Sequence, residues 1–299
     1  MADVSVIVPA YNSALTIGAC LRSIAAQTVP PKEVIVVDDG STDGSFEAAL
    51  ALAGEMKGIA LKVFRQDNAG AGAARNRALL EATGTYVAFL DADDQWLPEK
   101  LEKCLPFVAD YDLVCHNFIQ QEGEKNTLGN SARHLKDGDD PFPALFLRGF
   151  VATSTVITRR DLVLNEGGFD PSLRAGQDYD LWIALAARLG ARFKVLDEPL
   201  SLYHINPQGI TSAVERRMQA GLRIMRRQTF NLKGRVRFPH LFTLKRLTVI
   251  HVEAFNAWKK QGRWGQAAFV LLRWVGTLAT ELFMRRHSSD PRPTRLETP

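Results

Sequence analysis

Short runs of apolar residues alternate with helical patterns through the first hundred residues of the chain. The runs at 4–8, 33–37, 63–64 and 86–90 are rich in Val, Ile and Phe and are apolar nearly throughout. Strands of this kind are buried on both faces, as in a parallel sheet covered by helices. The pattern therefore predicts an α/β fold with a mostly parallel central sheet flanked by helices.

The helices expected between these strands have recognisable ends. Asn12 or Ser13 is placed to cap a helix that runs to about Gln27. A second helix is expected over residues 72–82, with Gly84 as its left-handed C-terminal stop.

Beyond residue 110 the pattern loosens. Residues 113–120 and 154–158 predict two further strands, 121–140 a polar loop, and 179–189 a helix with one apolar face. From residue 215 onward the chain is helical in pattern, basic and aromatic. We therefore expect a domain over 1–214, with halves 1–110 and 111–214, followed by a helical C-terminal extension over 215–299.

Polar residues gather where the predicted strands end. Tyr11-Asn12 follows the first strand, Asp38-Asp39 the second, and Asp91-Ala92-Asp93-Asp94 the fourth. The carboxyl ends of parallel strands form the usual ligand crevice of an open α/β sheet. The pattern predicts a pocket at this edge.

Two carboxylates, Asp91 and Asp93, lie two positions apart in this segment. In an extended backbone both side chains point to one side, where their negative charges repel each other. A bound divalent cation commonly offsets this repulsion. Mg²⁺ or Mn²⁺ bound by one or two carboxylates commonly completes its shell with phosphate oxygens, which predicts a diphosphate site. The alternative is that these acids cap the helix beginning near Pro98.

The other strand ends fit the same ligand. One carboxylate of Asp38-Asp39 suits a nucleobase imide, and Tyr11 suits stacking on that base. Arg75, within the small-residue segment 68–76, is placed to reach the diphosphate. That segment is not a GxGxxG loop, so a dinucleotide site is not favoured.

Composition and charge add a second feature. The chain has 299 residues, 46% hydrophobic and 23% charged, as in a globular protein. Residues 1–214 contain 19 Lys and Arg against 28 Asp and Glu, a net charge of −9, whereas residues 215–299 contain 18 against 5, a net charge of +13. A basic extension implies an anionic partner: a membrane surface, nucleic acid or the acidic domain itself. No recognition motif supports nucleic acid.

Neither a signal segment nor a cysteine framework is indicated. The apolar run at 4–8 is too short for a signal core, which predicts a cytoplasmic protein. Cys20, Cys104 and Cys115 lack a CxxC spacing and are expected to be reduced packing residues.

Four segments resemble the successive motifs of the family 2 inverting glycosyltransferases, which have a GT-A fold. They are SVIVPAYN at 5–12, VDDGSTD at 37–43, ARN at 74–76 and FLDADD at 89–94. The resemblance implies a nucleotide-sugar-binding half over 1–110 and an acceptor-side half over 111–214. It implies that Pro9, Tyr11, Asn12 and Asp39 hold the nucleotide, usually with uracil as the base.

The resemblance also implies roles for the residues nearest the diphosphate. Arg75 would position the donor, Asp91 would contact the ribose or sugar, and Asp93 would bind the metal, with Asp94 sharing that task.

The segments expected on the acceptor side also resemble the family motifs, but they differ from them at two places. Segments 168–173 (GFDPSL) and 177–182 (QDYDLW) look like the acceptor motif, in which Asp178 keeps the position of the general base and Gln177 replaces an acid. An Asp at a helix start is also a good N-cap. In segment 203–206 (YHIN), His204 stands where relatives often carry Arg, and Asn206 where they carry a metal-side His. Either Asn206 serves there or His204 substitutes.

The sequence thus predicts an inverting, metal-dependent glycosyltransferase that moves a sugar, expected from a UDP-sugar, to a glycan or lipid-linked acceptor in bacterial exopolysaccharide or cell-surface glycan assembly. Two rivals are an inactive nucleotide-sugar-binding module and a sugar-phosphate nucleotidyltransferase. Charges at Arg273 and Glu281 interrupt the apolar stretch 264–284, which argues against a membrane span. The C-terminal region is instead expected to lie on an anionic inner membrane surface, to pack on the domain or to form a homodimer.

Overall fold

The computed structural model describes residues 1–205, 213–283, 291–293 and 296. One sheet runs through the molecule, with strands in the order β3-β2-β1-β4-β8-β6-β9-β5 and β7 paired to β6. The strands are β1 (Ala2–Ala10), β2 (Pro31–Asp38), β3 (Ala60–Arg65), β4 (Tyr86–Phe89), β5 (Gln95–Trp96), β6 (Leu113–Glu122), β7 (Lys125–Gly129), β8 (Ile157–Arg159) and β9 (Phe193–His204).

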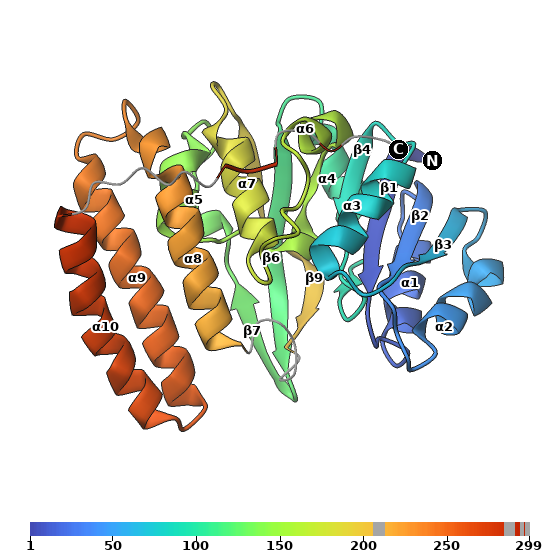
Figure 1. Ribbon diagram of the computed structural model, residues 1–299. Helices are drawn as coiled ribbons and strands as arrows, with labels where there is room; N and C mark the ends of the chain where they lie inside the picture. Colours follow the sequence, from blue (N-terminus) through green and yellow to red (C-terminus); the bar gives the residue numbers. More distant parts are fainter. Residues whose placement is uncertain (206–212, 284–290, 294–295, 297–299) are drawn as a thin grey trace.

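Helices cover both faces of this sheet (Figure 1). They are α1 (Ile17–Ala25), α2 (Ser45–Ala51), α3 (Ala71–Glu81), α4 (Lys100–Cys104), α5 (Pro141–Leu147), α6 (Arg160–Asn165), α7 (Gln177–Ala187), α8 (Val214–Gln228), α9 (Pro239–Lys260) and α10 (Trp264–Phe283). The α/β class, the flanking helices and the helical C-terminal region are confirmed.

The first half of the sheet is parallel and the second is mixed. Strands β3, β2, β1 and β4 all run the same way. The three-residue strand β8 inserts between β4 and β6 and is antiparallel to both, whereas β6 and β9 are parallel. The chain thus returns to the middle of the sheet to join its two halves.

Alternation along the buried strands builds a core on each face. On β1, Val4, Val6 and Val8 pack with α1 on one side, whereas Ile7 packs with α3 on the other. Successive side chains of a strand point to opposite faces, so a continuous apolar run is what this double burial requires.

Three local expectations are wrong. Helix α1 begins at Ile17 because the backbone N–H groups of Asn12 and Ser13 donate to Ser41 Oγ and Ser45 Oγ, at 2.9 and 2.6 Å. The segment expected to be a polar loop contains strand β7. Gly84 is not left-handed, since its φ is not positive.

Gly84 instead serves a close approach of two backbones. A Cβ at this position would lie 2.7 Å from the backbone nitrogen of Ser5, which is too close for any side chain.

Helices α8, α9 and α10 stand side by side at the end of the molecule away from β1–β3, with α10 outermost (Figure 1). Helix α8 is tied to the sheet domain by buried ion pairs, in which Arg227 Nη1 lies 3.1 Å from Asp170 Oδ2 and 3.0 Å from Asp180 Oδ1. Arg292 adds a second contact to Asp180, at 2.6 Å. Part of the basic charge of this region therefore neutralises acids of the domain. None of the described helices is both long and apolar enough to cross a bilayer.

Candidate active site

The ends of β1, β2 and β4 meet at one edge of the sheet, as the sequence predicts. The backbone N–H of Asp39 donates to Ala10 O at 2.8 Å, and that of Leu90 donates to Ile7 O at 3.1 Å. Segment 91–94 therefore emerges beside β1, opposite the loop after β2. The three predicted groups of polar residues therefore form one rim at the carboxyl edge of the sheet.

The residues after β1 form the exposed side of this rim. Pro9 is buried within β1, whereas Tyr11 beyond its end is 55% exposed and available for stacking. Asn12 has a left-handed backbone with φ 47°, and its Oδ1 accepts a hydrogen bond from the backbone N–H of Thr42 at 3.1 Å. Asn12 therefore ties the two strand-end loops together, and its nucleotide role stays a prediction.

The carboxylate of Asp39 is buried and bound by protein donors. It accepts hydrogen bonds from Gln66 Nε2 at 2.7 Å, from Ala69 N at 2.9 Å and from Gly70 N at 2.7 Å. These bonds fix the loop that leads into α3. A carboxylate offers about four lone-pair positions, so one remains for the expected nucleobase.

Arg75 on α3 and Asp91 after β4 form the central ion pair. Arg75 Nη2 lies 2.5 Å from Asp91 Oδ1, and its Cζ lies 5.2 Å from the centre of the Phe169 ring. Burial disfavours the charged guanidinium, but the attraction of Asp91, with smaller contributions from Asp178 and Asp93, raises the pKa of Arg75. Carboxylates from two segments, 91–94 and the start of α7, thus act on one buried cation.

The neighbouring carboxyl of Asp93 suits a divalent cation. Burial, followed by the charge of Asp91, raises the pKa of Asp93 to about 6. A bound cation would relieve this penalty, and Mg²⁺ with phosphate ligands needs only one or two carboxylates. Across the described part of the chain, no group of three or more His, Cys, Asp or Glu side chains is arranged to hold a metal. The metal role of Asp93 stays a prediction, in which a diphosphate would supply the remaining ligands.

The carboxylate of Asp94 is hydrogen-bonded to two other segments of the chain. Its Oδ2 accepts from Ser154 Oγ at 2.5 Å, and its Oδ1 accepts from the backbone N–H of His204 at 2.9 Å. Burial, with the charges of Asp91 and Asp93, raises the pKa of Asp94 well above its usual range. Both oxygens have protein donors, so a metal role would require one of them to be released.

His204 lies at the end of β9, close enough to Asp93 for its charge to act on that carboxyl. Its Nδ1 is buried and has no hydrogen-bond partner among the described residues. That nitrogen is suited to a ligand, and the metal role of His204 stays a prediction. Asn206, the alternative, lies outside the described residues.

Asp178 is the second residue of α7, and its acceptor-side role stays a prediction. The Thr153 hydroxyl donates to Asp178 Oδ2 at 2.9 Å. Gln177 is buried: its amide donates to Leu173 O at 2.5 Å and lies against Gly72 of α3. The Gln that replaces an acid therefore fills a packing position, where a neutral amide is cheaper to bury than a carboxylate.

Asn76, the neighbour of Arg75, connects the two sides of the pocket. Its Nδ2 donates to Phe169 O at 2.7 Å, and its Oδ1 accepts from Phe169 N at 2.8 Å. The Phe169 ring packs edge-on against Phe89 and Trp182, with centroids 5.5 and 5.9 Å away. Sequence reasoning missed this connection and Thr153, because neither residue spacing nor hydropathy reports contacts across 93 or 25 residues.

Solved structures share this fold. The chain superposes on S. aureus TarS 1-349 in complex with UDP with a TM-score of 0.63 and 23% identity, over 95% of this chain and 84% of that one. The mannosyltransferase PcManGT of Pyrobaculum calidifontis, in complex with GDP-Man and Mn2+, gives a TM-score of 0.63 at 23% identity, over 94% and 79%. At these identities the likeness concerns the GT-A fold alone.

Sequence relatives are nearer. The chain is 33% identical over 213 residues to the amylovoran biosynthesis glycosyltransferase AmsB of Erwinia amylovora, covering 67% of this chain and 69% of AmsB. Against a glycosyltransferase of Rickettsia felis it is 31% identical over 186 residues, or 62% of this chain, and spans only 30% of that longer protein. The model of glycosyl transferase family 2 matches residues 5–164, more than half of the chain. The chain therefore belongs to glycosyl transferase family 2.

Proposed function

We propose that this protein is an inverting, metal-dependent glycosyltransferase that moves a sugar from a UDP-sugar to an acceptor hydroxyl in bacterial polysaccharide or cell-surface glycan assembly. The observation that carries the proposal is the buried ion pair of Arg75 with Asp91 at the carboxyl ends of β1, β2 and β4. Asp93 lies two residues from Asp91, and the charge of Asp178 also acts on Arg75. The residues proposed for the donor and for the acceptor thus act on one buried cation.

The donor assignment rests on the rim formed by β1 and β2. Tyr11 offers an exposed ring for the base, and Asp39 keeps a free acceptor position beside it. The UDP in the TarS structure supports uracil as that base. Pro9 and Asn12 would shape the same rim, and Asp91, held by Arg75, would contact the ribose or sugar.

The metal assignment rests on Asp93, with Asp94 and His204 as further candidate ligands. When bound, Mg²⁺ or Mn²⁺ would neutralise the charge that develops on the leaving diphosphate. The Mn2+ in the PcManGT structure supports this choice of ion. Arg75 would supply a second, fixed positive charge to the same group.

Asp178 is the proposed general base. Its carboxylate would accept the proton of the incoming hydroxyl, while the hydrogen bond from Thr153 Oγ1 holds it in place. A positioned base contributes about 10²–10⁴-fold to such a reaction. Gly176 precedes α7 in a left-handed conformation with φ 70°. This turn sets where α7 starts and therefore the direction in which the side chain of Asp178 leaves the helix.

The Asp178→Asn variant tests the function. We expect it to bind UDP and Mn²⁺ as the parent does, because the substitution is isosteric and lies away from the donor side. We expect transfer to fall by about 10²-fold or more. Near-parental turnover would contradict the base assignment.

A second measurement separates the enzyme from the two rival functions. Mn²⁺-dependent release of UDP from a UDP-sugar, measured without acceptor, is expected of a transferase and not of an inactive binding module. A nucleotidyltransferase would instead form pyrophosphate from a sugar phosphate and a nucleoside triphosphate. Pyrophosphate formation would therefore replace the proposal.

A further inference from the structure

Helix α10 exposes a continuous apolar face. Trp264, Leu271, Leu272 and Val275 are 60%, 45%, 71% and 62% exposed. Their spacing places them on one side of the helix. Between Trp264 and Thr280, all of which the structure describes, no charged side chain is classed as exposed. Soluble proteins rarely expose an apolar stripe of this length without a partner.

A second face on α9 joins this stripe. Leu241, Lys245, Val252 and Lys259 are exposed and share one side of α9 by helical spacing. Lys259 Nζ lies 5.6 Å from the centre of the Trp264 ring, so the two faces meet at the turn between the helices. We call their combined surface the α9–α10 face: Leu241, Lys245, Val252, Lys259, Trp264, Leu271, Leu272 and Val275.

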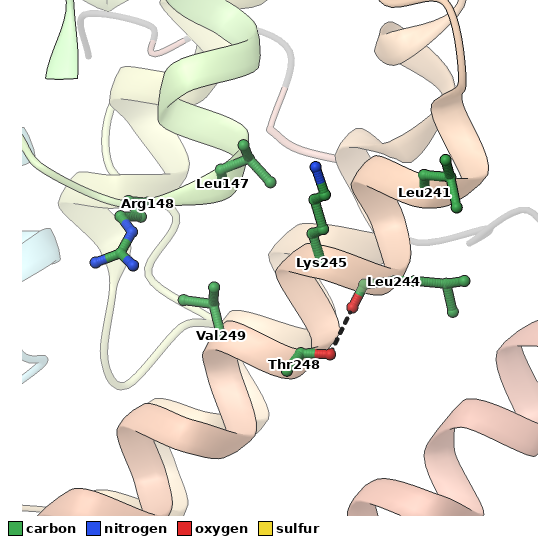
Figure 2. A pocket seen from close by; sticks show the side chains of 7 residues that line it. All are labelled: Leu147, Arg148, Leu241, Leu244, Lys245, Thr248 and Val249. Carbon is green, nitrogen blue, oxygen red and sulfur yellow. Dashed lines mark hydrogen bonds between the residues drawn. The ribbon is translucent and has the colours of Figure 1, made fainter.

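A groove of about 480 Å³ lies along the α9 part of this face. Figure 2 shows its two walls, with Leu147 and Arg148 at the end of α5 and Lys245 on α9. Leu241, Leu244 and Val249 also line it, whereas the Thr248 hydroxyl is bonded to Leu244 O at 2.9 Å. The groove thus offers aliphatic walls and two cations, and its lining contains no acidic residue.

Cations of this region make two kinds of contact. Arg227, Arg235, Lys260, Arg273 and Arg292 form ion pairs with acids of the chain. Lys245 and Lys259 instead lie over aromatic rings: Lys245 Nζ is 5.8 Å from the centre of the Phe242 ring. Long basic side chains that lie along apolar surface with their charge at its edge are typical of helices at a lipid interface.

Charge identifies the occupant of the α9–α10 face. A second copy would bring together two faces whose charged side chains, Lys245 and Lys259, are positive, and like charges across an interface oppose association. An anionic bilayer supplies both an apolar layer and a complementary charge. We propose that the α9–α10 face docks on a bilayer containing anionic phospholipid, with the phosphate of one lipid held between Arg148 and Lys245.

This inference goes beyond the proposed function and does not depend on it. The α9–α10 face nevertheless lies close to the candidate active site, since only five residue steps separate Arg148 from Thr153, at most about 18 Å of extended chain. A membrane-attached acceptor would then be presented near Asp178, whichever sugar is transferred.

Co-sedimentation with phosphatidylcholine vesicles, with and without phosphatidylglycerol, tests the proposal. The full chain is expected to bind the anionic vesicles preferentially. The double variant Leu271→Ser/Leu272→Ser should weaken that binding about tenfold or more, because two exposed apolar side chains no longer enter the interface. Arg148→Gln/Lys245→Gln should reduce the preference for anionic lipid. The matched controls are Leu189→Ser, at a fully exposed leucine after α7, and Arg133→Gln, both expected to bind as the parent does.

Three outcomes would overturn the proposal. One is equal or no binding to the two kinds of vesicle, and another is unchanged binding by both double variants. The third is seen by light scattering without lipid: a dimer that Leu271→Ser/Leu272→Ser converts to a monomer would assign the face to a second copy.

Discussion

At the scale of single residues, most carboxylates of the candidate site already have hydrogen-bond or ion-pair partners within the protein. Asp39 holds the loop before α3, and Asp94 holds the end of β9. Asp91 is paired with Arg75. Asp93 differs from these three, since within the described part of the chain its carboxyl forms no ion pair and no hydrogen bond with a hydroxyl. The charges of His204 and Arg75 offset its burial only in part, and its pKa is raised to about 6. A bound cation would therefore stabilise the ionised form of Asp93 more than that of the other three carboxyls.

We expect Asp93→Asn to weaken Mn²⁺-dependent UDP binding about tenfold or more, because the amide cannot balance the charge of the ion. Titration calorimetry with Mn²⁺, and again with chelator, measures the metal-dependent part. Asp67→Asn, which removes an exposed carboxylate from the loop before α3, is the matched control. If Asp93→Asn bound UDP with parental affinity in Mn²⁺, the metal role would be lost.

Thr153 is expected to act as a positioning residue. Removing its hydroxyl in Thr153→Val frees Asp178 to rotate, so kcat should fall about tenfold while the KM for the donor is unchanged. Thr153→Ser should restore kcat. Thr155→Val, whose hydroxyl bonds Ala152 O in the same turn, should leave both constants unchanged. A rise in donor KM, or no rescue by Ser, would show that Thr153 supports the fold only.

The strand-end residues could be predicted because sequence order fixes which strand ends meet in a parallel sheet. The partners of those residues could not. Thr153 meets Asp178 from the first residue of a turn, Thr153–Thr155, that overlaps the strand expected from residue 154, and Gln177 packs on Gly72. Such contacts depend on how separate elements dock, which residue spacing does not encode.

At the scale of elements, the end of the sheet opposite the pocket is fastened by one carboxylate. Glu33 at the start of β2 is buried and accepts hydrogen bonds from Ser5 Oγ at 2.6 Å and Thr83 N at 2.7 Å, and Lys62 Nζ lies 2.7 Å away. Burial alone would raise the pKa of Glu33, but the bonds from Lys62, Ser5 and Thr83 lower it to about 2. A single side chain thus links β1, β2, β3 and the segment before β4.

Glu33→Gln should lower the free energy of unfolding by about 2 kcal/mol at neutral pH, because the amide keeps one acceptor for Ser5 and Thr83 but turns an NH2 group toward Lys62 in place of the charged Oε2. Since the folded pKa lies below the ordinary value of 4.5, this stabilisation is fully present above pH 4.5 and is lost as pH falls toward about 2. Urea unfolding across that range measures the difference from the parent. Asp3→Asn, at an exposed pair with Lys32 on the same edge, should cost less than about 1 kcal/mol. A difference that did not shrink with acid would contradict the assignment.

The ends of helices and strands agree with the sequence prediction where hydrophobic patterning determines them. They differ from it where hydrogen bonds of polar groups determine them. Strand β1 and helix α3 lie within a few residues of their predicted limits. Helix α1 starts late because Asn12 and Ser13 bond to a loop 29 or more residues away. Strand β7 was missed because its five residues are polar or exposed and are held by pairing with β6.

At the scale of the whole molecule, the C-terminal region completes the domain. Asp170 and Asp180 are buried, and their counter-charges come from Arg227 on α8 and from Arg292. Arg292 also donates to the backbone carbonyls of Glu166 and Gly168. The buried charge of Asp180 on α7 is therefore balanced by residues far along the chain.

Arg292→Met should lower the free energy of unfolding by about 3 kcal/mol, since it leaves part of the charge of Asp180 buried without its partner. Chemical denaturation monitored by circular dichroism measures this. Arg133→Met, at an exposed arginine, is the control and should change stability by less than about 0.5 kcal/mol. Equal stability of the two variants would mean that Arg227 alone satisfies Asp180.

The insertion of β8 between β4 and β6 has a consequence for synthesis of the chain. While residues 90–159 are still being translated, β4 has only β1 beside it, and its other edge, an apolar run at 86–89, is open. At 5–20 residues per second this takes about 4–14 s. An unpaired apolar edge invites pairing with another nascent chain. The ribosome-bound protein is therefore most prone to aggregate in that interval, and slower translation of residues 90–159 would lengthen it.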